Sequence, residues 1–265
     1  MHSIGLLDAA VANNASWCDA VCRSHGHPGV FGSRLWSSPR HRLRFYPNAI
    51  TLRPEVTVPE VLAAAAPSQP FAVKDSFARL DLAPAGFRLL AEASWIVRDR
   101  APGGQPDDGL SWDKITSPGE LRAWETAWAG GGHGDGGAVF QPGLLSDQRC
   151  DVLACRRDGA IVAGAIVYAA NRAAGISNLF STGLPLDRVW ASIQQAVAGL
   201  RPHLPAVGYE EGASLEAARQ AGFRVLGTLR VWTRPSSAEP ASLPEVAVGH
   251  RGRGVRVGDE AEFGA

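Results

Sequence analysis

"AGFRLL", at residues 85–90, and "AGFRVL", at residues 221–226, are nearly the same six residues and occur twice in one chain. Their glycines, Gly86 and Gly222, lie 136 positions apart. A glycine permits a tight helix-to-strand turn because it has no Cβ, and the phenylalanine that follows can pack into a core. The repeated hexapeptide therefore predicts that one helix-turn-strand unit is built twice in this chain.

The segments around the two hexapeptides follow the same order of elements. In the first half the patterns predict a strand in residues 41–52, a helix in 57–66, a strand in 70–77 and a strand or tight hairpin in 87–98. In the second half they predict a strand in residues 173–181, a helix in 186–200, a strand in 205–210, a helix in 214–221 and a strand or hairpin in 223–234. The shared order predicts a tandem repeat whose first copy is truncated.

Three further elements are predicted outside the repeat. Residues 3–26 have apolar side chains at helical spacing, with Gly26 as a stop. Ser117 and Pro118 are helix-start signals, followed by Trp124 and Trp128 four residues apart. Residues 150–170 form a hairpin around the turn at residues 158–159, which are Asp and Gly.

A stretch rich in Pro, Gly and Asp at residues 100–110 marks a boundary. It divides the chain into a truncated N-terminal lobe, residues 1–105, and a C-terminal lobe, residues 106–234. Residues 235–265 lose apolar periodicity, which predicts a disordered tail. The fold class expected is α/β, of the α+β type, with mixed central sheets flanked by helices.

Composition limits the classes of partner. Lys and Arg number 26 and Asp and Glu number 26, so no overall field draws the chain to nucleic acid or to an anionic membrane. No apolar run reaches the roughly 20 residues of a membrane span, and the chain opens without a charged and then apolar leader. Four cysteines do not make a secreted disulfide framework. We expect a cytoplasmic protein without a membrane partner, for which nucleic acid is a disfavoured ligand.

The element order from Trp112 to Arg234 resembles that of the GNAT (N-acetyltransferase) superfamily. The resemblance is clearest in two segments, "RRDGAIVAGAIVY", residues 156–168, and "SLEAARQAGFRVLG", residues 214–227. The resemblance implies two GNAT-like lobes, the first truncated. It also implies transfer of an acyl group from acetyl-CoA, or another acyl-CoA, to a small-molecule amine without a metal.

In this superfamily an Arg/Gln-x-x-Gly-x-Gly/Ala loop holds the CoA pyrophosphate on bare backbone N–H groups. Here Pro185, Arg188 and Trp190 occupy the three defining positions, so the fingerprint is absent. Either Gly183 supplies the turn and Arg188 grips phosphate with its side chain, or Arg188 is an ordinary solvated residue and Trp190 packs in the core. The cofactor-binding candidates are Phe180, Ser181, Gly183 and Arg188, together with Ser214, a polar residue that could replace the family's groups near the start of the last helix.

The family's usual proton donor and cofactor-facing amide are replaced in this chain by Ala218 and Glu211. Glu210, at the end of a strand beside the substrate gap, is the best general base, although an exposed loop carboxylate is the ordinary alternative. Ser177 and Asn178 either line the place where the acyl carbonyl binds or simply alternate along a strand. The catalytic candidates are therefore Glu210, Glu211, Asn178 and Tyr209.

Two other functions stay open: a non-catalytic binding protein with the same fold, and a transferase that takes aminoacyl-tRNA in place of acyl-CoA. A cluster of metal-binding residue types also occurs near the first helix, at Cys18, Cys22, His25 and His27. Its spacing does not match a short zinc knuckle, so buried cysteines at the end of a helix are the alternative.

Overall fold

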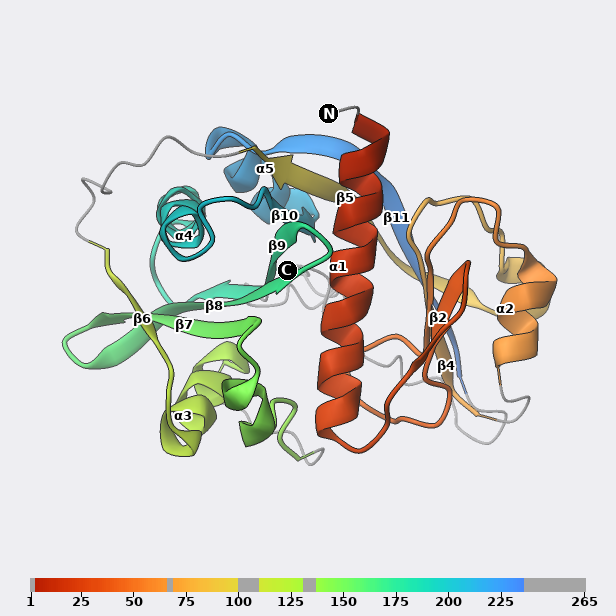
Figure 1. Ribbon diagram of the computed structural model, residues 1–265, viewed down its shortest axis with the longest axis horizontal. Helices are drawn as coiled ribbons and strands as arrows, with labels where there is room; N and C mark the ends of the chain where they lie inside the picture. Colours follow the sequence, from red (N-terminus) through yellow and green to blue (C-terminus); the bar gives the residue numbers. More distant parts are fainter. Residues whose placement is uncertain (1–2, 66–68, 100–109, 131–136, 236–265) are drawn as a thin grey trace, which may run out of the picture.

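The computed structural model describes residues 3–65, 69–99, 110–130 and 137–235. Within these ranges the strands form one sheet in the order β1-β2-β3-β4-β11-β5-β10-β9-β8-β7-β6 (Figure 1). The strands are β1 (Val30–Phe31), β2 (Leu35–Ser37), β3 (Ala49–Thr51), β4 (Phe71–Asp75), β5 (Arg88–Arg98), β6 (Trp112–Lys114), β7 (Cys150–Arg157), β8 (Ala160–Ala170), β9 (Ala173–Ser181), β10 (Ala206–Glu210) and β11 (Arg224–Arg234). The helices are α1 (Ser3–Ser24), α2 (Val58–Ala64), α3 (Pro118–Trp128), α4 (Leu186–Leu200) and α5 (Gly212–Gln220), with 3-10 turns η1 (Ala83–Ala85) and η2 (Pro142–Ser146).

The predicted fold class is confirmed, and the sheets expected in the two halves are joined into one. The last strand of each half lies inside the other half. β5 sits between β10 and β11, and β11 sits between β4 and β5. Each of these segments, for which a strand or a hairpin was expected, is a single strand of 11 residues.

The repeated glycines form left-handed turns, with φ of 81° at Gly86 and 87° at Gly222. Because β5 and β11 are antiparallel, the end of each strand reaches the turn that begins the other. The Arg234 guanidinium lies 5.0 Å from the centre of the Phe87 ring. A Cβ at Gly222 would stand 2.5 Å from Arg98 Nη1. These contacts therefore hold the ends of the exchanged strands against the two turns. That the two turns arose by duplication stays a prediction.

Helices cover both faces of the sheet. Trp17 of α1 and Trp124 of α3 pack in one core with Ile166 of β8, and Trp190 of α4 packs in another with Val167, the next residue of β8. Neighbouring strand residues point to opposite faces, so α1 and α3 lie on one face and α4 and α5 on the other. α1 crosses the middle of the sheet (Figure 1).

The predicted helices at the start of the chain and after Ser117 are confirmed, and the Ser117 Oγ accepts the N–H of Glu120 as a helix cap. The strand predicted in residues 41–52 is wrong before Ala49. There the Asn48 side chain accepts the Ala72 N–H and donates to the His41 carbonyl oxygen, and these side-chain bonds hold the residues before Ala49 in a loop. The residues beyond 235 and those at 100–109 lie outside the described ranges. Among the described helices none is long and apolar enough to cross a membrane.

Candidate active site

The parallel strands β9 and β10 diverge near the middle of the sheet. They pair at Ala174 with Ala206 and at Gly175 with Val207, and no described pair follows. At the point of divergence Gly208 comes so close to β9 that a Cβ there would lie 3.2 Å from the Ile176 carbonyl oxygen. Beyond this point the two strands leave a wedge between them.

A β-bulge shapes the β9 side of the wedge. Gly164 of β8 pairs with Phe180, and Ile166 pairs with Ser177, so β9 carries one residue more than β8 across this interval. Asn178 absorbs the extra length with φ of 54°, a value that Asn tolerates better than most residues. Bulges commonly redirect side chains next to active sites.

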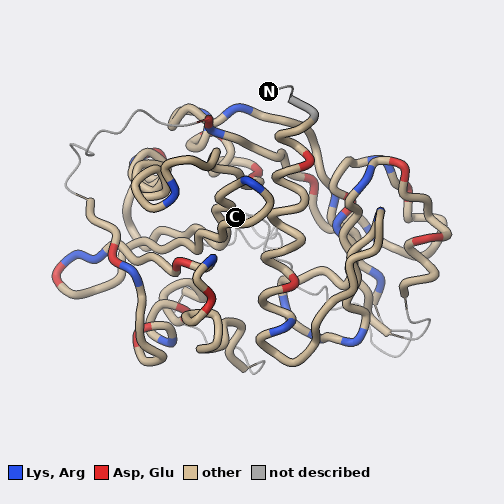
Figure 2. The backbone as a smooth tube through the Cα atoms, in the orientation of Figure 1, with Lys and Arg blue, Asp and Glu red and all other residues tan. Residues whose placement is uncertain are grey.

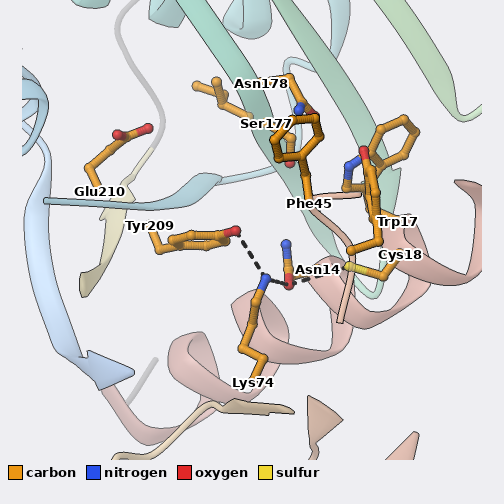
Figure 3. Close-up of a pocket in the computed structure, with 11 residues that line it drawn as sticks. Asn14, Trp17, Cys18, Phe45, Lys74, Ser177, Asn178, Tyr209 and Glu210 are labelled. Atoms are coloured by element: carbon orange, nitrogen blue, oxygen red, sulfur yellow. Dashed lines mark hydrogen bonds between the residues drawn. The ribbon is translucent and has the colours of Figure 1, made fainter. Parts of the chain in front are cut away.

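A small cavity lies at the open end of the wedge (Figure 3). Its volume is about 30 Å³, which is enough for at least one water molecule. Segments far apart in the chain form its wall. The lining residues are Asn14, Trp17 and Cys18 of α1, Phe45 and Tyr46 of the loop before β3, Lys74 of β4, Ile176, Ser177 and Asn178 of β9, and Tyr209 and Glu210 of β10.

Three of the predicted catalytic residues meet at this cavity: Asn178, Tyr209 and Glu210. Tyr209 packs on the α1 face of the sheet, with its ring edge-on to Trp95 at 5.3 Å. Glu210 is the next residue along β10, is buried, and projects to the other face. Glu211 does not line the cavity, since it is the exposed residue that precedes α5.

The predicted cofactor-binding residues do not gather at the cavity. Phe180 is buried with its ring 5.2 Å from Trp124, and Ser214 accepts a hydrogen bond from the Trp190 indole at 3.1 Å. Ser181 closes the loop after β9, where its Oγ accepts the Leu184 N–H at 3.0 Å. The other two residues lie in that loop and in the first turn of α4. They are Gly183, with φ of 121°, and Arg188, which is exposed.

Sequence reasoning missed Lys74 and Asn14. The Lys74 ammonium donates to Asn14 Oδ1 at 2.8 Å and to the Tyr209 hydroxyl at 3.0 Å, and it lies 4.2 Å from the centre of the Tyr209 ring. The signal was present in the sequence, because Lys74 is one of only two lysines and interrupts the strand pattern "FAVKD". A lysine inside a buried strand is rare unless it has a partner.

The cluster of cysteines and histidines does not assemble a metal site in the part of the chain that the structure describes. No group of three His, Cys, Asp or Glu residues there is placed to hold an ion. Cys18 and Cys22 are buried in the core between α1 and the sheet. The His25 Nε2 lies 2.9 Å from the Val139 carbonyl oxygen.

No family model and no curated protein matches this sequence. Among solved structures the chain is similar to a GCN5-related N-acetyltransferase from Kribbella flavida, with a TM-score of 0.60 and 18% identity over 86% of this chain and 96% of that one. It is also similar to a putative GNAT-family acetyltransferase from Novosphingobium aromaticivorans, with a TM-score of 0.55 and 16% identity over 90% of this chain and 100% of that one. A functionally unknown conserved protein from Staphylococcus epidermidis matches with a TM-score of 0.57 and 9% identity, over 78% of this chain and 93% of that one.

The two acetyltransferase structures are covered almost completely, so the likeness takes in both halves of the sheet. At these identities the likeness establishes the fold. The chain has the fold of the GCN5-related N-acetyltransferases, as the sequence resemblance predicted.

Proposed function

We propose that this protein transfers an acyl group from an acyl-CoA-like thioester to an amine. The observation that carries the proposal is the wedge between β9 and β10, with the bulged Asn178 at its edge and a cavity at its open end. Where strands part, backbone N–H groups lose their ladder partners and need another acceptor. The carbonyl oxygen of a thioester is an acceptor of that kind, and N–H groups aimed at it stabilise the negative charge that develops there during attack.

In the proposed reaction the amine nitrogen attacks the thioester carbonyl, a C–N bond forms and the C–S bond breaks. The amine loses one proton and the departing thiolate gains one. We assign the first proton transfer to Glu210 as general base and the second to the Tyr209 hydroxyl. Glu210 is preferred to Glu211 because only Glu210 lines the cavity. Much of the rate would come from holding the two reactants together.

The diphosphate of a CoA donor would need a cradle other than the family's glycine loop. The loop between β9 and α4 offers the turn at Gly183 and the exposed Arg188. A guanidinium can hold phosphate oxygens in pairs. The Asp187 carboxylate, one residue earlier in the first turn of α4, would repel the negatively charged diphosphate. We therefore expect the diphosphate to bind more weakly here than it would to a glycine loop. Only the thioester end of the donor would reach the wedge.

A non-catalytic binding protein of the same fold is the second candidate. The observation that favours it is the small volume of the cavity, about 30 Å³. Basic and acidic residues are interspersed along the backbone (Figure 2), so charge gives no support to a transferase that uses aminoacyl-tRNA.

Replacing the proposed base tests the transferase directly. We expect Glu210→Gln to lower kcat by about 100-fold or more, the usual contribution of a positioned general base, and to leave donor affinity unchanged. The measurement is thiol release from acetyl-CoA with a panel of amines, beside donor titrations by calorimetry. Glu211→Gln is the matched control, and its turnover should equal that of the wild type. Equal turnover for both variants would remove Glu210 from the mechanism, and donor binding without any turnover would favour the binding protein.

A further inference from the structure

Lys74 occupies a position where a charge is costly. All five residues of β4 are buried, and Lys74 is only 2% exposed. Its ammonium contacts an amide oxygen, on Asn14, and a phenol oxygen, on Tyr209. Buried charges in proteins normally have a counter-charge as well as hydrogen bonds.

The described residues supply no such counter-charge. Among them no carboxylate forms an ion pair with Lys74. Burial raises the pKa of the Cys18 thiol and of the Tyr46 hydroxyl, so both cavity residues are neutral at pH 7. The Glu210 carboxylate points away from Lys74 (Figure 3). Asp75 is the next residue of β4, so it faces the other side of the sheet, where it accepts the Leu80 N–H at 2.8 Å.

Asn14 accepts from this ammonium and can in turn donate to a ligand. An ammonium only donates, so the Asn14 atom that faces it is the oxygen, and the Asn14 amide nitrogen turns toward the cavity (Figure 3). Of the three ammonium hydrogens, two are directed to Asn14 and Tyr209. A cationic donor and an amide donor therefore meet at one cavity, and the matching ligand group is a small anionic acceptor.

We propose that this cavity binds the carboxylate of the amine acceptor, with the Lys74 ammonium as its counter-ion and the Asn14 amide as a second donor. The acceptor would then be an amino acid or another short amine that bears a carboxylate. The role of this amine as an acceptor rests on the proposed function, whereas the binding of a carboxylate at Lys74 does not. The single ammonium matches the single negative charge of a carboxylate, whereas a phosphate would need more counter-charge. With its carboxylate on Lys74, the amine would extend toward the wedge at Asn178.

Calorimetry with matched ligand pairs tests the site without any donor present. The pairs are glycine with methylamine, β-alanine with ethylamine, and phenylalanine with phenethylamine, together with acetate alone. We expect the wild type to bind at least one carboxylate-bearing amine saturably and its partner lacking the carboxylate at least tenfold more weakly. Lys74→Met should abolish that tenfold preference, and Lys74→Arg should restore part of it. If acetate alone binds as tightly as the amino acids, the site takes free carboxylates and the acceptor assignment is overturned.

The matched control is Lys114→Met, the same change at the only other lysine, whose ammonium pairs with Asp151 at 2.7 Å. It should keep the full preference for carboxylates. A second readout is the Tm without ligand, which should change little in Lys74→Met, because removal of a buried charge offsets the loss of the donor to Asn14 and Tyr209. An unchanged carboxylate preference in Lys74→Met, or no binding of any carboxylate by the wild type, would overturn the proposal. A Tm that falls in Lys74→Met, with Lys74→Arg unable to restore binding, would show a purely structural lysine. Failure of acetyl-CoA turnover with carboxylate binding intact would reject only the transferase.

Discussion

His41 is a buried histidine that the fold holds in its neutral form. Its Nε2 lies 3.0 Å from the Pro47 carbonyl oxygen, and its Nδ1 accepts the Leu43 N–H at 3.2 Å. These partners assign the proton to Nε2, because Nδ1 is already an acceptor. Burial, the largest cause, lowers the pKa of His41 from 6.5 to about 4.

This histidine predicts a loss of stability in mild acid. Between pH 6.5 and about 4 the unfolded chain protonates His41 and the folded chain does not, so the unfolded state gains protons as the pH falls. From pH 7 to pH 5 we expect His41 to lower the free energy of unfolding by about 2 kcal/mol. Urea unfolding at both pH values measures this difference. His41→Gln should lose that part of the pH dependence, and His203→Gln, at an exposed site, should keep it. A pH dependence that is the same in all three proteins would contradict the assignment.

At the scale of elements, helix α1 forms one wall of the cavity, so the cavity depends on how α1 is held against the sheet. The Asn13 amide nitrogen donates to three carbonyl oxygens at the β8–β9 turn: Tyr168 at 2.8 Å, Ala173 at 3.0 Å and Ala170 at 3.1 Å. A Cβ at Gly175 would overlap the Asn13 side chain, so only glycine allows this approach. The contact fixes the helix turn that also presents Asn14 and Cys18 to the cavity.

Asn13→Ala should therefore cost about 2 to 3 kcal/mol in the free energy of unfolding, because it leaves buried carbonyl groups without a donor. Chemical denaturation monitored by fluorescence measures this cost. Asn171→Gly is the matched control, since Asn171 makes two exposed bonds to α1, at Ala12 and Ser16, and its φ of 50° suits glycine. We expect the control to cost less than about 1 kcal/mol. Equal losses in the two variants would mean that Asn13 does not hold α1 in place.

Local patterns predicted the long elements well and the site only in part. α1 and α3 carry their periodicity and end signals within one segment, so the sequence is sufficient to locate them. The strands β1, β2 and β6, of two or three residues, are too short to show a pattern. The contact between Lys74 and Tyr209 joins residues 135 positions apart, and no local pattern reveals it.

At the scale of the whole molecule, the sheet depends on an exchange of strands between the two halves. β5 and β11 have the same sequence of exposed and buried positions along all 11 residues. Because the two strands share one pattern, the pattern does not distinguish the half that each strand joins. The sequence therefore revealed a repeated unit but not the exchange of its last strands. β10, the strand that carries Tyr209 and Glu210, borders the wedge on one side and the exchanged β5 on the other.

The central claim is that the wedge between β9 and β10 receives an acyl thioester, and a calorimetric titration with acetyl-CoA tests it most directly. The titration compares the wild type with Ser177→Trp, which fills the wedge, and with Ser33→Trp, which adds the same side chain at an exposed site. We predict saturable 1:1 binding in the wild type and in Ser33→Trp, and affinity at least tenfold lower in Ser177→Trp. No binding to the wild type, or equal affinity in all three proteins, would contradict the account.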